Sequence, residues 1–589
     1  MISTSQIRTC LLLSSVLGIL QNCQVSARKY NNQSDPDWPK TGEWLKLSRD
    51  LSLLAELYGP FESSDYEDLC YIDNEHMTSP FDIAKDMRGE GICMQYSDCT
   101  NSFCLGELGA KRDNLPAYVL MAKEEKDIVT GVQFANKYNI KVSVKSTGHS
   151  LSGASTAKDT LLIWLAQYPE DNTIQLDYQD SCGDTESHNV IGVAAGQNFK
   201  SIAEAVGDDY HFVSASEWTV SASGGFIQGG GVSFTSRHYG LGVDNVVDFR
   251  VVLPSSAVVI ADRCTNSDLF WALRGGGGGS FGIVTHMNYK LHAPTPIVRF
   301  SFNLEESSSN DTTVSTFLKY VAENLPNIDS RWGGRFSWFG LDMYFAGFPR
   351  GAQVTFLDDF IEFAMTNLNL PLSFWEKNHT RSYDSWSRVL PELEETTGQA
   401  YVAETSFSRL VPHDFATEQT VEHYQLLESL AKSNTLGYTN VLLGQNINKI
   451  PESETSVHPA FRESAFLLTA NQIGYEKLLE KLPNNVTGAS KNHVGSLEPN
   501  WRESIWGEHY ERLLEIKELY DPRNIFSCYQ CVGYEGEETD IYTKGKKLNP
   551  PNQAPTGGTI DQPTSAAQVL STGSKLIIIM IGFSMYLMS

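Results

Sequence analysis

The sequence predicts an α+β protein divided into more than one lobe, and three observations lead to that prediction. The chain has 589 residues, too many for a single small hydrophobic core. Between residues 113 and 295, a strand, an amphipathic helix and a second strand lead into a glycine-containing loop. Residues 296–490 instead contain alternating stretches typical of antiparallel strands, such as 334–344, together with helices that would cover the sheet, such as one predicted at 417–433.

The composition is that of a folded globular protein with an acidic surface. Hydrophobic residues make up 41% of the chain and aromatic residues 11%, while the formal net charge is −26. Nucleic acids require a basic surface, so this charge argues against a nucleic-acid partner. It also disfavours adsorption to anionic lipid, and it says little about a neutral substrate.

The N-terminus has the pattern of a secretory signal peptide over residues 1–27. Arg8 precedes an apolar run at 10–20, and small residues at 25–27 provide a cleavage site. The alternative is a buried N-terminal helix. We therefore expect an extracellular protein, and sequons such as the one at Asn32 agree with glycosylated surface loops.

The C-terminus has the pattern of a signal for attachment of a GPI lipid anchor. The apolar run at 576–588 is too short to span a bilayer as a helix, and small residues at 565–567 precede it. We expect residues 568–589 to be removed and residues 536–567, rich in Pro, Gly and Asn, to form a flexible stalk. The membrane would then be contacted only through the lipid anchor. The alternative is a short hydrophobic tail with no role.

The cysteines agree with secretion. Two of the ten fall in the predicted signal peptide, and the other eight are Cys70, Cys93, Cys99, Cys104, Cys182, Cys264, Cys528 and Cys531. An even number in an oxidising compartment indicates disulfides, and the four from Cys70 to Cys104 would brace an N-terminal extension at 28–112. Cys528 and Cys531 have zinc-like or redox-like spacing. No second such pair accompanies them, so we predict a structural disulfide and no metal site.

The extension contains a possible helix around residues 43–57. After it, a buried strand is predicted at 117–121, a helix at 126–138 and a second strand at 140–144. A β-hairpin is predicted from apolar runs at 246–253 and 257–261.

Three glycine-rich loops lie between apolar strands within about 140 residues. They are Val144–Ser155, Ser223–Ser233 and Leu273–Thr285. Glycines let the backbone turn tightly and approach a ligand closely, and successive N–H groups form a nest for phosphate. Each loop alone could be a simple flexible connection. Together they indicate a site for a phosphate-bearing cofactor.

The motifs KSTGHSLSGAS, GGFIQGGG, GVDNVVDFRVVLPS and ALRGGGGGSFGIVT resemble the FAD-binding domain of the vanillyl-alcohol-oxidase/PCMH flavoprotein superfamily. The C-terminal motifs WGEHYERL and YDPRNIF are similar to its berberine-bridge-enzyme-like branch. The resemblance implies a two-lobed PCMH-type FAD-binding domain at 113–295 and a substrate domain at 296–490, in which helices cover an antiparallel sheet. It also implies a segment at 491–535 that returns to the FAD domain.

The family resemblance also implies how FAD is held. In the family, the histidine of the first loop carries the flavin covalently, and here that residue is His149. Many relatives have a second link through a cysteine, but here Trp218 lies near that position and no cysteine lies between Cys182 and Cys264. We therefore expect monocovalent FAD. The other implied cofactor-binding residues are Lys145, Ser146, Thr147, Gly148, Ser152, Gly153, Ser155, Gly229, Gly230, Gly231, Phe281, Gly282, Ile283 and Thr285.

The implied reaction is hydride transfer from a substrate CH–OH, an alcohol or sugar, to the flavin, with O2 as the acceptor that reoxidises it. Fungal-type relatives carry acidic and tyrosine residues that the stretch 492–497 lacks. The candidates for the base are His493, Glu498, His509 and Tyr510, each of which could instead be structural. Two alternatives stay open: a dehydrogenase with another acceptor, and a surface protein that keeps the scaffold without catalysis.

Overall fold

The computed structural model of the chain describes residues 30–60 and 116–535. Short gaps fall at 151, 153, 184–185, 305–310, 349–351, 372–373, 375–378, 398–406, 434, 442–446, 485, 496–497 and 499. The predicted signal peptide, the cysteines from Cys70 to Cys104, the stalk and the C-terminal signal lie outside the described residues. The described residues belong to one unit that runs from Met1 to Gly545.

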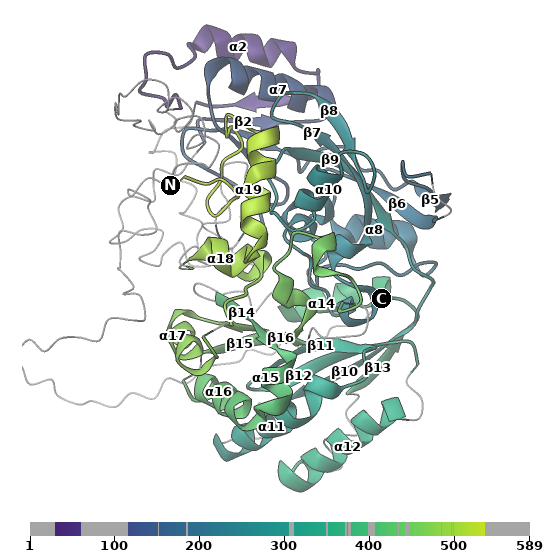
Figure 1. Ribbon diagram of the computed structural model, residues 1–589. Coiled ribbons are helices and arrows are strands. Elements are labelled where there is room, and N and C mark those ends of the chain that lie inside the picture. Colours follow the sequence, from purple (N-terminus) through teal and green to yellow (C-terminus); the bar gives the residue numbers. More distant parts are fainter. Residues whose placement is uncertain are drawn as a thin grey trace, which may run out of the picture. The chain divides into compact units, whose positions relative to one another are not determined.

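The first lobe contains two sheets (Figure 1). The four-stranded sheet has the order β1-β2-β4-β3, with β1 Glu56–Tyr58, β2 Tyr118–Met121, β3 Val142–Lys145 and β4 Leu161–Trp164. The antiparallel five-stranded sheet has the order β5-β6-β9-β7-β8, with β5 Ile174–Tyr178, β6 His188–Ala194, β7 Val246–Val252, β8 Val258–Ala261 and β9 Ile283–Lys290. The helices are α2 Thr41–Asp50, α7 Glu125–Tyr138, α8 Phe199–Val206, α9 Ser236–Tyr239 and α10 Ser267–Leu273.

The predicted strand, helix and strand are confirmed as β2, α7 and β3, and the predicted hairpin is confirmed as β7 and β8. Strands β2 and β4 pair in parallel and are buried along their whole length, which explains their unbroken apolar sequences. Helix α7 begins with a capping box between Glu124 and Asp127, and it ends at Asn139 in the left-handed conformation.

The helix predicted around 43–57 is only partly correct, because α2 ends at Asp50. Asp127 accepts hydrogen bonds from the backbone N–H and the hydroxyl of Ser52, at 2.8 and 2.9 Å. These bonds hold the chain in an extended path just after the helix. Residues Glu56–Tyr58 then pair with β2 as an antiparallel edge strand, so the extension is part of the sheet.

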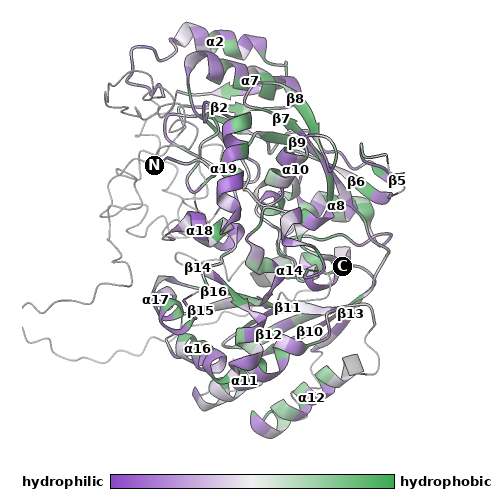
Figure 2. Ribbon diagram, viewed as in Figure 1, coloured by the Kyte–Doolittle hydropathy of each residue, from purple (hydrophilic) through white to green (hydrophobic). Residues whose placement is uncertain are grey.

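The second lobe is built on one antiparallel seven-stranded sheet with the order β13-β10-β12-β11-β15-β16-β14. Its strands are β10 Ile297–Asn303, β11 Trp332–Ser337, β12 Gly340–Ala346, β13 Thr380–Tyr383, β14 Phe407–Pro412, β15 Leu436–Val441 and β16 Ser464–Ala470. Its helices are α11 Asp311–Asn324, α12 Ala352–Asn367, α14 Leu390–Thr397, α15 His413–Glu418, α16 Thr420–Lys432 and α17 Gln472–Lys481. Figure 2 shows hydrophobic and hydrophilic residues alternating on covering helices such as α11 and α16, as amphipathic helices require.

Two predicted elements of this lobe are each divided in the structure. The stretch 334–344 forms parts of β11 and β12, which pair antiparallel across a turn at Trp338 and Phe339. The helix predicted at 417–433 is interrupted at Gln419, whose φ of −115° and ψ of 45° separate α15 from α16. The predicted architecture, an antiparallel sheet covered by helices, is confirmed.

The C-terminal segment returns to the first lobe through α18 Trp501–Trp506 and α19 His509–Tyr520 (Figure 1). The backbone N–H of Val142 donates to Ile525 O at 2.9 Å, and Phe526 forms a β-bridge with Val142. Segments about 380 residues apart in the sequence are therefore held together beside the end of β3.

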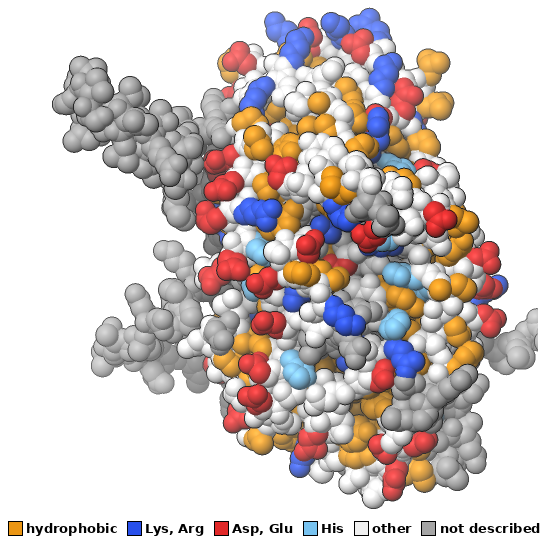
Figure 3. Space-filling model, turned by 45° about the vertical axis from the view of Figure 1, so that its right-hand side comes forward, with side chains coloured by type: hydrophobic (Ala, Val, Ile, Leu, Met, Phe, Trp, Pro, Cys, Tyr) orange, Lys and Arg blue, Asp and Glu red, His pale blue; other side chains and the backbone are white. Residues whose placement is uncertain are grey.

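Two disulfides lie within the described residues. Cys528 and Cys531 are bonded, which confirms the predicted structural disulfide, and Cys182 is bonded to Cys264. No helix within the described part of the chain is long and apolar enough to cross a membrane. On the face drawn in Figure 3, acidic and basic side chains are interspersed and form no basic patch.

We predict that His423→Phe stabilises the protein, and that the gain is larger at pH 5 than at pH 7.5. His423 is fully buried in α16 against Phe466, and neither ring nitrogen has a hydrogen-bond partner among the described residues. Burial lowers its pKa to about 4. The unfolded chain, with the ordinary pKa near 6.5, therefore binds the proton more readily between pH 4 and 6.5, and stability falls as pH falls through that range.

The expected contribution of His423 to this loss is about 2 kcal/mol at pH 5. Urea unfolding of the wild type and the variant at both pH values measures it. His413→Phe, at a histidine of α15 that bonds Asn327, is the matched control. Equal stability changes at both pH values in His423→Phe would contradict the prediction.

Candidate active site

A cavity of about 230 Å³ lies in the first lobe, where three glycine-rich loops meet the C-terminal segment. Its walls come from the loop after β3, from residues 215–232, from residues 278–284 and from residues 491–493. The lining residues are Val144, Ser146, Thr147, Gly148, His149, Ser150, Ser152, Ala154, Ser155, Leu165, Ala215, Ser216, Glu217, Val220, Ser221, Ser223, Gly224, Gly225, Phe226, Gln228, Val232, Gly278, Gly279, Gly282, Ile283, Val284, Lys491, Asn492 and His493.

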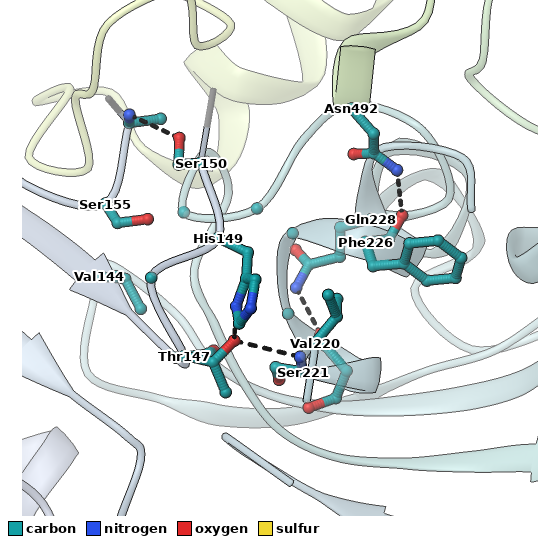
Figure 4. A pocket seen from close by; sticks show the side chains of 18 of the residues that line it. Val144, Thr147, His149, Ser150, Ser155, Val220, Ser221, Phe226, Gln228 and Asn492 are labelled. Atoms are coloured by element: carbon teal, nitrogen blue, oxygen red, sulfur yellow. Dashed lines mark hydrogen bonds between the residues drawn. The ribbon is translucent and has the colours of Figure 1, made fainter. Parts of the chain in front are cut away.

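His149 lies in the wall formed by the loop after β3, next to Thr147 (Figure 4). Its Nδ1 is 2.8 Å from Thr147 Oγ1, and its Nε2 is 3.5 Å from Thr219 Oγ1. Thr147 Oγ1 also accepts the backbone N–H of Ser221 at 3.2 Å, so its own hydrogen can point at Nδ1. Burial, assisted by the charge of Lys145, lowers the pKa of His149 to about 4. The imidazole is therefore neutral at physiological pH and keeps a nucleophilic lone pair.

A second wall of the cavity is the single π-helical turn η2 (Ala222–Phe226). It leaves room for a ligand close to the backbone. A Cβ placed on Gly224 would lie 2.8 Å from Ser146 Oγ, whereas a Cβ placed on Gly225 meets no atom within 4 Å. Gly225 therefore borders open cavity space. Two buried polar atoms of this wall, Ser221 Oγ and Gln228 Oε1, have no hydrogen-bond partner among the described residues and can serve a ligand.

The third wall is a single 3-10 turn, η9 (Lys491–His493), just before α18. Asn492 donates from Nδ2 to Phe226 O at 2.7 Å, which joins this turn to η2 (Figure 4). His493 Nδ1 is 3.0 Å from Ser490 Oγ, and Nε2 has no partner among the described residues. Burial lowers the pKa of His493 to about 4, so this imidazole is also neutral.

The structure places many of the predicted site residues together in the cavity wall. They are Ser146, Thr147, Gly148, His149, Ser152, Ser155, Gly282, Ile283 and His493. Gly153 lies outside the described residues. Trp218 does not line the cavity, because its ring packs beneath the Lys200 ammonium at 5.2 Å, and no cysteine lines the cavity among the described residues.

Other predicted cofactor residues lie behind the wall. Lys145 is fully buried with its ammonium 5.3 Å from the Trp164 ring. Phe281 belongs to the hydrophobic core, and the Thr285 hydroxyl bonds Glu125 at 3.2 Å.

The glycines at 229, 230 and 231 face protein atoms instead of the cavity. A Cβ on Gly229 would lie 2.0 Å from Asn492 Oδ1, and a Cβ on Gly231 would lie 3.0 Å from the Cα of Gly242. Glycine is therefore needed at positions 229 and 231 because neighbouring chain segments pack closely against them.

Of the four candidates for the base, only His493 lines the cavity. Glu498 forms a buried ion pair with Arg409 at 2.8 Å. His509 Nδ1 bonds Val457 O at 2.9 Å, and Tyr510 accepts a hydrogen bond from Arg502 Nε at 3.0 Å. These three side chains have structural partners in the described chain.

Sequence reasoning missed several lining residues, including Glu217, Gln228, Lys491 and Asn492. The glycines at 224–225 and 278–279 lie in the second and third predicted glycine-rich loops. Other residues of those loops were assigned to the cofactor from the sequence. Nothing local marks Lys491 and Asn492, because their position depends on contacts with segments distant in sequence.

The residues present suit a dinucleotide cofactor. The cavity offers a serine-rich loop, an open glycine at position 225 and unpaired polar atoms on Ser221 and Gln228. Its lining is otherwise largely neutral, with Glu217 as the acidic residue and Lys491 as the basic one. This set fits a long ligand that alternates polar and aromatic parts.

Comparison with known proteins gives the same assignment. A family model described as an FAD binding domain matches residues 116–262, and one described as berberine and berberine like matches residues 476–533. The chain is 27% identical to an uncharacterised FAD-linked oxidoreductase of Arthroderma benhamiae, over 85% of this chain and 93% of that protein. It is 25% identical to the VAO-type flavoprotein oxidase VAO615 of Thermothelomyces thermophilus, over 92% and 99% of the two chains.

Solved structures share the fold. The VAO-type flavoprotein MtVAO615 from Myceliophthora thermophila C1 matches with a TM-score of 0.69 and 23% identity, covering 86% of this chain and 97% of that chain. A glucooligosaccharide oxidase from Acremonium strictum, whose structure shows a novel flavinylation, matches with a TM-score of 0.55 and 20% identity, over 71% and 91% of the two chains.

The fold and the cavity, together with these relatives, define an FAD-dependent oxidoreductase. The matches support a place for the chain in the vanillyl-alcohol-oxidase/PCMH superfamily, among the berberine-bridge-enzyme-like proteins.

We predict that Gly225→Leu lowers the flavin content per purified chain to a small fraction of the wild-type value without unfolding the protein. A side chain at this position would project into the cavity, where no protein atom opposes it. The absorbance of flavin relative to protein measures the loss, and circular dichroism checks the fold. Gly42→Leu, also at a glycine with open space around its Cβ but in α2, is the control. Full flavin content in Gly225→Leu would mean that the cofactor does not use this space.

Proposed function

We propose that the protein is an oxidase that holds FAD covalently through His149 and transfers hydride from the CH–OH group of an alcohol or sugar to it, with O2 as the final acceptor. The proposal rests on one observation: His149 and His493, two neutral imidazoles, line the same cavity. Bound FAD would supply the hydride-accepting ring, and the chain must supply attachment, orientation and a proton acceptor.

His149 is suited to the covalent attachment. Its neutral imidazole is oriented by Thr147, which in turn is fixed by the backbone of Ser221. Both ring nitrogens lie near threonine hydroxyls, and burial together with the charge of Lys145 disfavours the protonated form. The other glycine walls would orient the dinucleotide through backbone N–H groups.

His493 is suited to accept the proton that leaves the substrate hydroxyl. Ser490 Oγ is placed to accept the hydrogen on Nδ1, which leaves a lone pair on Nε2. Ser490 is itself positioned by its backbone N–H, which donates to Ser408 Oγ at 3.1 Å. In the tautomer that carries its hydrogen on Nδ1, the imidazole presents the Nε2 lone pair in the cavity wall, as a general base requires.

The choice of O2 rests on the relatives. VAO615 is named an oxidase, and the Acremonium strictum protein is named a glucooligosaccharide oxidase. A dehydrogenase with another acceptor would use the same cavity. Release of hydrogen peroxide during turnover of alcohols and sugars distinguishes the oxidase from the dehydrogenase.

We further propose that the protein works outside the cell, held at the surface by a lipid. The disulfides Cys182–Cys264 and Cys528–Cys531 support an oxidising compartment. Release of the protein from intact cells by a phospholipase that cleaves GPI anchors tests the anchor.

We predict that flavin fluorescence stays with the wild-type chain on a denaturing gel and is lost in His149→Ala. Removal of the imidazole removes the attachment atom, while the glycine walls can still bind FAD noncovalently. Thr219→Val, which takes away the neighbouring hydroxyl but no attachment atom, is the matched control and keeps the fluorescence. Flavin released entirely from the denatured wild type would exclude the covalent link.

We predict that His493→Gln slows flavin reduction by a substrate roughly 10²- to 10⁴-fold. Glutamine keeps hydrogen-bonding capacity but cannot take up the proton. Stopped-flow absorbance of the flavin under anaerobic conditions measures the rate, and flavin content should equal that of the wild type. Glu498→Gln, which disturbs the ion pair outside the cavity, is the comparison. Reduction at the wild-type rate in His493→Gln would remove His493 from the mechanism.

A further inference from the structure

Lys491 is the one lysine or arginine among the residues that line the described cavity. The other ionisable residues in the lining are Glu217, His149 and His493. Since both histidines are neutral, Lys491 is the one lining side chain that can carry a positive charge. FAD brings two negative charges on its pyrophosphate, and the chain as a whole is strongly acidic, with a net charge of −26. A single cation in this cavity therefore has a large electrostatic effect.

The position of Lys491 is fixed by its neighbours. Its Nζ donates to Gln530 O at 2.9 Å and lies 6.0 Å from the centroid of the Trp506 ring. Its Cε is 3.3 Å from the point where a Cβ on Gly277 would stand, so the side chain runs along the third glycine loop. Gln530 lies inside the loop closed by the Cys528–Cys531 disulfide, and its Nε2 donates to Gly495 O at 3.1 Å.

The ammonium of Lys491 lacks a negative partner in the described chain. An ammonium has three N–H donors, and the Gln530 carbonyl takes one of them. No carboxylate forms an ion pair with it among the described residues. The neighbouring disulfide loop contributes Tyr529, and α18 contributes the Trp506 ring. The third glycine loop contributes no carboxylate, and its one cation, Arg274, donates to Glu454 O at 2.6 Å. Burial alone lowers the pKa of Lys491 to about 7, with no charged group offsetting it.

Lys491 is half-buried, and a partly desolvated cation without a counter-charge is unfavourable unless a ligand supplies one. We propose that Lys491 provides the positive charge that pairs with an anionic group of bound FAD. This proposal rests on the proposed function only in taking the cavity as the FAD site. The anionic group is either the pyrophosphate or the ring system, which gains negative charge when it is reduced or when an anion adds to it. Lys145 cannot take this role, because it is fully buried against Trp164 behind the wall.

The two sources of negative charge are separated by measuring two quantities on the purified flavoprotein. The first is flavin content per chain, because FAD must bind through its pyrophosphate before it can be attached to His149. The second is the affinity for sulfite, which forms an S–N5 bond with oxidised flavin and places its electron pair, and hence negative charge, in the ring. Sulfite needs no other reactant, and the bleaching of the flavin absorbance reports the adduct.

The variants are Lys491→Met, which removes the charge, and Lys491→Arg, which keeps it. Lys319→Met, at an exposed lysine of α11 paired with Glu323, makes the same change in net charge far from the cavity and serves as the control. If Lys491 faces the ring, the Met variant binds sulfite roughly tenfold or more weakly than the wild type, while the Arg variant stays within a few-fold. If Lys491 faces the pyrophosphate, the Met variant loses flavin and its loaded fraction binds sulfite normally.

Wild-type flavin content together with wild-type sulfite affinity in Lys491→Met would overturn the proposal. Lys491→Gln repeats the measurement if the Met variant does not fold. Neither quantity requires a substrate, so a wild-type flavoprotein that oxidises no alcohol or sugar would refute the proposed function alone. Absence of flavin from the wild type would refute both.

Discussion

The buried ammonium of Lys517 joins the C-terminal segment to the third glycine loop. Its Nζ donates to Ser280 O at 2.5 Å and to Phe526 O at 2.7 Å, and it pairs with Asp521 at 2.6 Å. Breaking a buried pair of this kind costs roughly 3–5 kcal/mol, so α19 cannot leave the loop without a large loss of stability. The cavity depends on this junction, because the turn Lys491–His493 reaches the glycine loops only while the segment that follows it is docked there.

A second set of buried charges holds the two lobes together. Arg237 in α9 donates to the carbonyls of Ile328 and Trp332 at 2.9 and 2.6 Å, and Arg462 makes two bonds of 2.9 Å to Asp244. Both guanidiniums are almost fully buried. Each arginine thus satisfies groups on the opposite lobe that would otherwise be unpaired, and the substrate lobe is fixed against the loops that form the cavity.

The fold was predictable wherever a local pattern decides it. Local sequence alone indicates three elements: the apolar run predicts strand β2, the helical spacing of apolar residues predicts α7, and the glycines after β3 predict a loop. The errors occurred where a distant residue decides the outcome: Asp127 ends α2 by bonding Ser52, and hydropathy alternates straight through the turn between β11 and β12. His149 was found because it lies inside a motif. Lys491 was missed because its partner, the Gln530 carbonyl, is brought to it only by the complete fold.

The contact between Gly229 and Asn492 constrains how this protein can evolve. Any side chain at 229 would collide with the side-chain amide of Asn492. That amide donates the hydrogen bond to Phe226 O that joins η9 to η2. A mutation at 229 is therefore tolerated only together with a smaller residue at 492, and such a change would shift the turn that carries the two ionisable side chains beside it. Positions 229 and 492 are therefore coupled, because a side chain at 229 requires a change at 492 that would also alter the bond between η9 and η2.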